Sequence, residues 1–241
     1  ITSVPSGKEA IKRFEHEDFD MVITMLHIGN ISPFQLAVEL RKKKKELPIV
    51  LLIGMLSDTK YIQDKEETKL FNDIFLWNGD SKLFLAMIKS VEDKLNLEND
   101  TKIGLVKVIL LVEDSIKYYS MLLPMLYQEI MKQTQYLLES EVRESEKRTK
   151  MRARPKIILA HTLEEAKKII YKYQENILGV ISDTAYYSEE KIDPEAGIKL
   201  ISLVKQFPYE IPSILLSSDE RNKNKAEKIH TIFLHKYSRD L

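Results

Sequence analysis

The feature that most constrains the fold is a short apolar run at residues 177–183, which reads ILGVISD and ends on a carboxylate. A continuous apolar run of this length, bounded by polar and turn-forming residues, is typical of a β-strand that is covered on both faces. Open α/β sheets place their sites at the carboxyl ends of such strands. Asp183 is therefore the first candidate for a functional side chain.

Further polar side chains stand at the ends of other predicted strands. They are Glu113 and Asp114 after residues 108–112, Ser217 after residues 213–216, and Lys236 after residues 232–235. Parallel strands end at the same edge of a sheet, so this pattern predicts that three carboxylates, one hydroxyl and one ammonium lie together. The alternative is that the aspartates only cap the helices that follow them.

The composition excludes several classes of protein. The formal net charge of zero argues against a general nucleic-acid binder, whose affinity rests on a cationic surface. No apolar run approaches the roughly 18 residues needed to span a bilayer, so we expect no membrane segment. Cysteine is absent, which rules out disulfides and cysteine-based zinc sites. We expect a cytoplasmic protein, with which this absence is compatible.

Predicted strands alternate with predicted helices along all 241 residues, which indicates parallel sheets with helices on both faces. The strands are expected at residues 1–4, 20–26, 48–54, 74–77, 106–112, 155–160, 177–183, 212–217 and 231–236. Capping signals mark three helix starts: Ser6 and Thr162 each precede a Glu by three residues, and Ser32 precedes a proline.

The two halves of the chain repeat one pattern. The segment DMVITML corresponds to LGVISD, LPIVLLIG to IPSILLSS, and NDIFLWNGD to HTIFLHKYS. A repeat of about half the chain is too long for a solenoid unit and indicates two domains of the same fold. We expect a first domain at residues 1–97, a polar linker at 98–105 and a second domain at 106–241.

The least settled element begins near residue 115. Apolar and aromatic residues continue from there to Leu137, and mostly charged residues follow from 139 to 154. One interpretation is an ordinary helix followed by a charged insertion. The other, which we favour, is an extended helix at residues 115–149 that pairs with a second copy of the chain or docks a downstream domain.

Four separated motifs in the second half resemble those of response-regulator receiver domains. They are LLVEDS at residues 110–115, ISD at 181–183, LLSSD at 215–219 and FLHK at 233–236. The resemblance implies two flavodoxin-like, doubly wound domains with five-stranded parallel sheets, the second with an extended first helix. The first half resembles a degenerate receiver, because Met25, Ile53 and Asn78 stand where Asp183, Ser217 and Lys236 stand in the second half.

A receiver-like first domain would also have a central strand and a helix that precede residue 1. A sheet without its central strand would bury unpaired backbone groups, so we expect these elements upstream, and a final helix beyond residue 241. The tandem further resembles the N-terminal regulatory part of bacterial proteins related to phosphoenolpyruvate synthase and pyruvate phosphate dikinase. That resemblance rests on FLWNGD at 75–80, LVEDS at 111–115, KQTQ at 132–135 and MRARPKI at 151–157.

The receiver resemblance implies a phosphoryl transfer from the phosphohistidine of a histidine kinase or phosphotransfer protein to Asp183. Glu113, Asp114, Asp183 and the backbone carbonyl of Ala185 would bind Mg²⁺, a cation that prefers oxygen ligands. Lys236 would pair with a phosphoryl oxygen, where its charge offsets the charge of the transferring group.

The resemblance also implies a conformational response to phosphorylation. Ser217 would supply the switch hydroxyl and Phe233 the switch aromatic, which together signal to an attached or separate output domain. Two other functions remain open. The tandem could be a structural or dimerisation scaffold that is never phosphorylated. A phosphohydrolase of the haloacid dehalogenase type also uses an Asp nucleophile with Mg²⁺, but it needs a second Asp where Ala185 stands.

Overall fold

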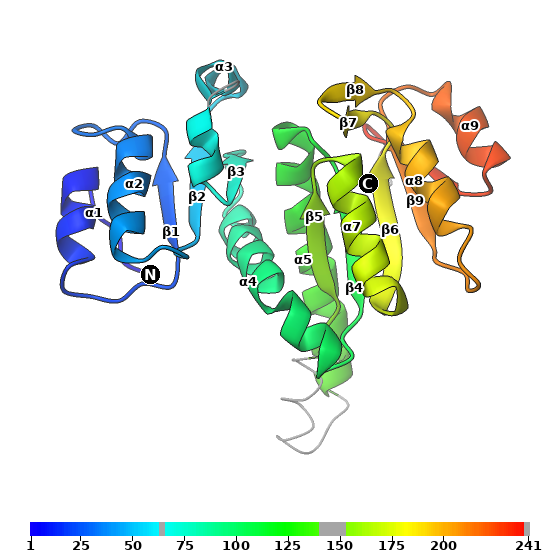
Figure 1. Ribbon diagram of the computed structural model, residues 1–241, viewed down its shortest axis with the longest axis horizontal. Coiled ribbons are helices and arrows are strands. Elements are labelled where there is room, and N and C mark those ends of the chain that lie inside the picture. Colours follow the sequence, from blue (N-terminus) through cyan, green and yellow to red (C-terminus); the bar gives the residue numbers. More distant parts are fainter. Residues whose placement is uncertain (63–65, 140–152, 239–241) are drawn as a thin grey trace. The chain divides into compact units, whose positions relative to one another are not determined.

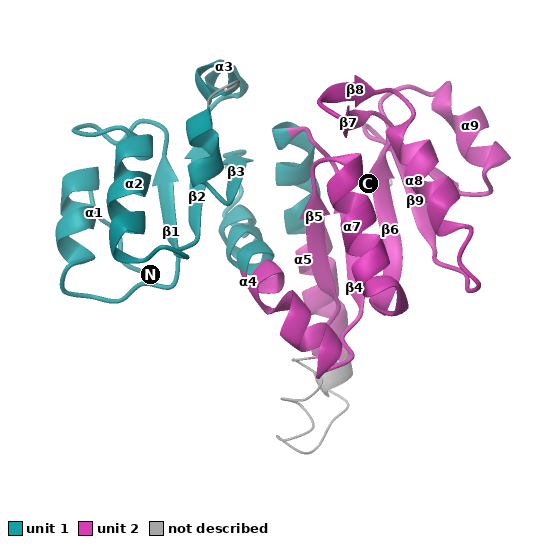
Figure 2. Cartoon of the chain, in the orientation of Figure 1, with its two compact units in different colours: residues 1–91, 116–125 teal, residues 92–115, 126–241 magenta. Residues whose placement is uncertain are grey.

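The computed structural model describes residues 1–62, 66–139 and 153–238. Its contacts divide the chain into two compact units, which Figure 2 shows in different colours. Unit 1 comprises Ile1–Val91 and Ile116–Met125, and unit 2 comprises Glu92–Ser115 and Leu126–Leu241. Helices α4 (Lys82–Lys102) and α5 (Ile116–Glu139) therefore contribute residues to both units.

Unit 1 is built on a parallel sheet in the order β1-β2-β3 (Figure 1). The strands are β1 (Val22–Met25), β2 (Ile49–Ile53) and β3 (Asp73–Leu76). The helical segments that belong wholly to the unit are α1 (Gly7–Arg13), α2 (Pro33–Lys43), α3 (Thr59–Ile62) and the 3-10 turns η1 (Leu56–Asp58) and η2 (Glu66–Leu70). The central strand β2 is buried at every residue, as its continuous apolar sequence predicts.

The predicted capping residues begin the helices as expected. The side chain of Ser6 accepts a hydrogen bond from the backbone N–H of Glu9, and that of Thr162 accepts one from Glu165. Ser32 and Gln35 form a reciprocal capping box at the start of α2. These local signals were sufficient because each bond joins residues only three positions apart.

Unit 1 departs from the sequence prediction in its extent. Residues 1–4 form no strand, which corrects that prediction, because they have no hydrogen-bonded neighbour in the sheet. The described residues of unit 1 supply three parallel strands of the four expected up to residue 77. Between β2 and β3 the chain forms α3 and η2, and residues 63–65 lie outside the described part of the chain.

The open edge of β3 is closed by side chains from the first half of α5. The backbone N–H of Leu76 donates to Ser120 Oγ at 2.9 Å, and the hydroxyl of Tyr119 donates to the carbonyl oxygen of Ile74. The Tyr119 ring also meets Phe75 edge-on, with ring centroids 5.6 Å apart. Side chains therefore satisfy edge groups that a further strand would otherwise pair.

Unit 2 contains a five-stranded parallel sheet in the order β10-β9-β6-β4-β5. Its strands are β4 (Val108–Val112), β5 (Lys156–Ala160), β6 (Ile177–Asp183), β9 (Ser213–Ser217) and β10 (Ile232–His235). Numbered one to five along the chain, these strands follow the order 2-1-3-4-5, which is the flavodoxin-like arrangement of doubly wound sheets. The strand predictions for this half are confirmed to within two residues at each end.

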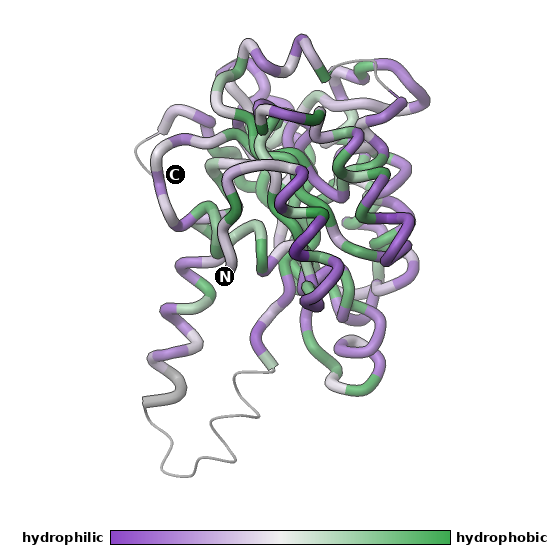
Figure 3. The backbone as a smooth tube through the Cα atoms, turned by 90° about the vertical axis from the view of Figure 1, so that its left-hand side faces the viewer, coloured by the Kyte–Doolittle hydropathy of each residue, from purple (hydrophilic) through white to green (hydrophobic). Residues whose placement is uncertain are grey.

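Helices connect the strands of unit 2 as in other doubly wound sheets. They are α7 (Leu163–Tyr173), the 3-10 turn η3 (Gln174–Asn176), α8 (Ala196–Val204) and α9 (Asn222–Lys228). Leu163, Ala166 and Ile170 of α7 and Leu200 and Val204 of α8 share one core with alternate residues of β4 and β5 and with Ile177 and Val180 of β6. In Figure 3 the coiled stretches of the tube carry both hydrophobic and hydrophilic residues, as expected for helices with one buried face.

A short hairpin between β6 and α8 was not predicted. It consists of β7 (Tyr186–Ser188) and β8 (Lys191–Asp193), and its turn places Glu189 and Glu190 at positive φ. The side chain of Tyr186, the first residue of β7, is fully buried, and Ser188 donates a hydrogen bond to Glu164 of α7. The hairpin is thus fixed to the rest of unit 2 through Tyr186 and Ser188.

A buried ionic cluster closes the edge strand β5. The carboxylate of Asp93, in the part of α4 that belongs to unit 2, accepts from Arg154 at 2.6 Å and from the backbone N–H of Ile157 at 3.0 Å. Lys156 pairs with Asp93 at 3.4 Å and with Asp100 at 2.7 Å. Because the carboxylates and the cations offset one another, this edge buries charge without leaving it unpaired.

Helix α4 is longer than expected, so the predicted linker at 98–105 is helical as far as Lys102. Helix α5 continues through Glu139, and the remainder of the helix expected over 115–149 lies outside the described residues. Among the described residues, no helix combines the length and the apolar character needed to cross a membrane.

Candidate functional site

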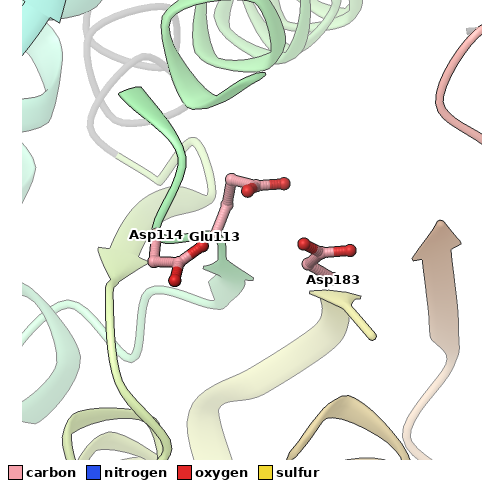
Figure 4. Close-up of side chains that lie close together, drawn as sticks. All are labelled: Glu113, Asp114 and Asp183. Carbon is pink, nitrogen blue, oxygen red and sulfur yellow. The ribbon is translucent and has the colours of Figure 1, made fainter. Parts of the chain in front are cut away.

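Three carboxylates from two neighbouring strands of unit 2 lie together (Figure 4). Glu113 and Asp114 follow β4, and Asp183 is the last residue of β6. The two strands pair with Val112 opposite Ser182, so the residues that follow in each strand reach the same edge. One oxygen of each carboxylate lies within 4.8 Å of the others. The predicted juxtaposition of these three residues is therefore present.

Lys236 supplies the positive charge of the site. Its ammonium donates to Glu113 Oε2 at 2.6 Å and lies 2.8 Å from Asp183 Oδ2. The Lys236 and Glu113 side chains are almost completely buried, and that of Asp183 is 14% exposed. One cation is thus shared by two carboxylates in a place where water screens charge weakly.

The electrostatics of the site disfavour full ionisation. Burial, together with the nearby charge of Asp183, raises the pKa of Glu113 from 4.5 to about 7, although Lys236 opposes the shift. Burial and the charge of Asp183 also raise the pKa of Asp114. The site thus holds three carboxylates and one lysine, so negative charge is in excess when all are ionised.

This donor set fits a divalent cation with a preference for oxygen. Carboxylate oxygens are the ligands that Mg²⁺ takes in proteins, usually one or two together with water and phosphate. Glu113, Asp114 and Asp183 offer such oxygens within 4.8 Å of one another, and a bound cation would offset their excess negative charge. Among the described residues, this cluster consists of carboxylates alone, which favours a hard cation over zinc.

Ser217 and Phe233 lie on the strands beyond β6. Asp183 pairs with Leu216 in the β6–β9 register, so Ser217 is one residue past the partner of the acidic side chain. The Ser217 hydroxyl oxygen accepts from the backbone N–H of Asp219 at 3.1 Å and from Asn222 Nδ2 at 2.9 Å. Phe233 is half-buried against the small core formed by Ile201, Leu215 and Ala226.

Ala185 is two residues past Asp183 and is half-buried between the end of β6 and the start of β7. Its role as a carbonyl ligand stays a prediction. His161 follows β5, and its Nδ1 lies 3.0 Å from the backbone carbonyl of Glu113. That contact braces the main chain at the acidic pair.

Two residues around Asp183 were not singled out from the sequence. Thr184 is buried and bonds to the Asp183 carboxylate through its backbone N–H, and Gly197 of α8 lies directly against the Asp183 carbonyl. Thr184 continues the strand by one polar residue, which is a weak signal. Gly197 is 14 positions further along the chain, so its proximity to Asp183 depends on the path of the β7–β8 hairpin that lies between them.

The corresponding positions of unit 1 carry no such chemistry. Met25 ends β1 and is 50% exposed, and Ile53 ends β2 and is fully buried. Asn78 follows β3 and accepts a hydrogen bond from the backbone N–H of Asp80, as a turn residue does. Within the described residues, the acidic cluster occurs in unit 2.

Comparisons with known proteins give little further information. No family model matches the chain, and no curated protein matches it. One solved structure that it resembles is described as the structure of a probable two-component system response regulator/GGDEF domain protein. The identity is 17%, the alignment covers 98% of this chain and 80% of that one, and the TM-score is 0.35. A likeness at this level does not establish a shared function, and nothing found bears on the dikinase-related resemblance.

Proposed function

We propose that unit 2 is a receiver-type module in which Asp183 accepts a phosphoryl group in a Mg²⁺-dependent reaction. The observation that carries the proposal is the shared lysine. Lys236 lies 2.6 Å from Glu113 and 2.8 Å from Asp183, at the carboxyl edge of a sheet with the flavodoxin-like strand order. An acidic triplet with one buried lysine at this edge is suited to holding a doubly charged cation and a transferring phosphoryl group.

The transfer needs a nucleophile and stabilisation of charge. An oxygen of Asp183 forms a bond to phosphorus while the bond from phosphorus to the donor imidazole nitrogen breaks, and that nitrogen keeps the electron pair. Lys236 then stabilises the negative charge on the phosphoryl oxygens through its ammonium. Asp183 carries its side chain at the edge of the sheet with 14% exposure, which leaves it open to a donor.

Mg²⁺, when bound by Glu113, Asp114 and Asp183, would offset the charge of the carboxylates and of the phosphoryl group. The partner would be a histidine kinase or a phosphotransfer protein. Ser217 and Phe233 are the residues through which the phosphorylated state would reach an output domain. The hydroxyl of Ser217 would leave its present partners, Asp219 N–H and Asn222, for a phosphoryl oxygen.

The test uses beryllofluoride, which mimics an acyl phosphate on aspartate. We would record ¹⁹F NMR spectra of the protein with beryllofluoride, with and without Mg²⁺, for the wild type and for Asp183→Asn. Asp20→Asn serves as the control, because Asp20 is an exposed residue before β1 in unit 1. We expect a bound fluoride signal that needs Mg²⁺, survives in Asp20→Asn and is lost in Asp183→Asn.

Absence of a bound signal in a folded wild-type protein would contradict the proposal. The rival function, a receiver-like scaffold that is never phosphorylated, would then account better for unit 2. A signal that persists in Asp183→Asn would instead assign the acceptor role to another carboxylate of the cluster, with Asp114 the first to be tested.

A further inference from the structure

Thr184 makes three hydrogen bonds that fix the chain at Asp183. Its backbone N–H donates to Asp183 Oδ1 at 2.7 Å, and its hydroxyl donates to the carbonyl oxygen of Leu216 at 2.8 Å. Its own carbonyl oxygen accepts from the backbone N–H of Gly197 at 3.0 Å. The residue is buried, with 2% of its surface exposed, so these bonds do not compete with water.

The bond to Leu216 replaces one that the backbone would otherwise make. In the parallel pairing of β6 with β9, the N–H of Val180 donates to the carbonyl of Pro212. This pattern repeats every two residues, so a continued ladder would direct the N–H of Thr184 to the carbonyl of Leu216. The hydroxyl of Thr184 takes that carbonyl instead, and the N–H is released to the carboxylate of Asp183.

Helix α8 holds the same peptide from the other side. A Cβ on Gly197 would lie 1.9 Å from the carbonyl oxygen of Asp183, so only glycine permits this approach. Ser182 donates to that same carbonyl oxygen at 2.8 Å. The main chain at Asp183 is therefore held by β9 and α8 together.

We propose that Thr184 is a positioning residue for the acceptor Asp183. The hydroxyl of Thr184 donates to the Leu216 carbonyl in place of its backbone N–H, so that this N–H can orient the Asp183 carboxylate. The two carboxylate oxygens are distinguished as a result: Oδ1 accepts from Thr184, and Oδ2 faces Lys236. The inference rests on the proposed function, because it concerns the same carboxylate. It adds a requirement for a hydroxyl at position 184, which neither the acidic cluster nor the lysine implies.

The hydroxyl can be removed at nearly constant shape. Thr184→Val deletes it, and Thr184→Ser retains it without the methyl group. Thr101→Val is the matched control, because Thr101 is also buried and its hydroxyl also donates to a backbone carbonyl, that of Leu97 in α4. Both valine variants lose the same kind of bond, but only one lies beside Asp183.

The first measurement is the affinity for beryllofluoride in the presence of Mg²⁺. We expect Thr184→Val to weaken binding about 10- to 100-fold, which is typical when a partner that orients a ligand is removed. Thr184→Ser should restore most of the affinity, and Thr101→Val should match the wild type. The second measurement needs no ligand: in ¹⁵N-¹H spectra the amide proton of residue 184 should shift strongly in the Val variant and little in the Ser variant.

The outcomes separate the two proposals. If the wild type binds and Thr184→Val binds equally tightly, the positioning role is wrong while the acceptor function stands. If the wild type does not bind, the acceptor function fails, and the amide shift still shows whether the hydroxyl directs the N–H to Asp183. Should Thr184→Val not fold, Thr184→Ala carries the same test, and equal binding by Ala and Ser would overturn the inference.

Discussion

The two units use similar parallel strands but end them differently. In unit 1 the strands β1 and β2 end on Met25 and Ile53, whereas in unit 2 the strands β4 and β6 lead into Glu113, Asp114 and Asp183. The apolar interiors of the strands are sufficient to build both sheets. The residues at the strand ends or just past them decide the chemistry, and in unit 2 they bring buried charge that must be offset by Lys236.

The edges of the two sheets differ in the same way. Tyr119 and Ser120 close the edge of β3 in unit 1 with neutral hydrogen bonds. In unit 2 the edge strand β5 meets Asp93 and Tyr127, and the Asp93 carboxylate also holds two cations. Unit 2 therefore pairs buried charges at the edge of β5 and at the candidate site, whereas neutral groups close the edge of β3 in unit 1.

The largest effect is expected where buried charge is left unpaired. Asp93→Ala removes the carboxylate that holds Arg154 and Lys156, and we expect it to lower the free energy of unfolding of unit 2 by about 3–5 kcal/mol. Asp58→Ala in unit 1 is the matched variant. Asp58 is also buried but accepts from the neutral backbone N–H groups of Gly54 and Met55, so its loss should cost about 1 kcal/mol.

Chemical denaturation combined with amide hydrogen exchange, resolved by unit, measures both effects. Faster exchange in β5 for Asp93→Ala and in the segment after β2 for Asp58→Ala would be the expected distribution. Equal losses for the two variants would remove the distinction between an ionic and a neutral framework.

A second expectation concerns pH and the metal-free site. The pKa of Glu113 is about 7 in the folded protein, against 4.5 for an ordinary glutamate. The folded state therefore holds its proton more tightly than the unfolded state between these values. Stability that is present below pH 4.5 is lost as the pH rises through 7, by at most on the order of 3 kcal/mol.

Glu113→Gln removes that titration while keeping an oxygen near Lys236. We expect denaturation curves without metal to lose less stability between pH 5 and pH 8 in the variant than in the wild type. Hydrogen exchange in β2 of unit 1, which ends on Ile53, should not respond to this substitution. If the stability of the wild type and that of Glu113→Gln changed in the same way between pH 5 and pH 8, the raised pKa of Glu113 would be contradicted.

How far the sequence could predict this molecule depends on the range of the interactions. The strands of unit 2 were predictable because each is a continuous apolar run, and the caps at Ser6, Ser32 and Thr162 because they are local. The meeting of Asp114, Asp183 and Lys236 followed from the parallel order of the strands and the resemblance to receivers. These are features that a few neighbouring residues, or one topological rule, determine.

The remaining features depend on contacts that no local pattern records. Arg154 lies in a charged stretch that predicts a solvated surface. Its guanidinium is nevertheless buried and donates to the carboxylate of Asp93, 61 positions away. Tyr119 and Ser120 look like ordinary helix residues, and their role at the β3 edge depends on tertiary packing. Residues 1–4 were predicted as a strand, but a strand also needs a neighbour to pair with.

A third expectation concerns the close approach of α8 to the acceptor strand. Gly197→Ala would place a Cβ 1.9 Å from the Asp183 carbonyl oxygen, so α8 must move, and we expect a loss of roughly 1–3 kcal/mol in the stability of unit 2. Gly54→Ala is the counterpart after β2 in unit 1, where the nearest atom would be 3.9 Å away. Thermal unfolding of the two variants should show a lower midpoint for Gly197→Ala alone. A normal midpoint for it would mean that α8 adjusts freely.

The smallest effects should come from the neutral bonds at the sheet edges. Ser120→Ala leaves the part-buried N–H of Leu76 without its acceptor, and we expect a loss of about 1 kcal/mol that is confined to β3. Tyr127→Phe removes the hydroxyl that lies 3.0 Å from Asp93 and 3.3 Å from the carbonyl of Ile157, with an effect of similar size in β5. Hydrogen exchange at Leu76 and Ile157 distinguishes the two. If Tyr127→Phe lowered the free energy of unfolding as much as Asp93→Ala, the hydroxyl and not the charge would stabilise the edge strand β5. The contrast between the two units would then lie in geometry instead of in electrostatics.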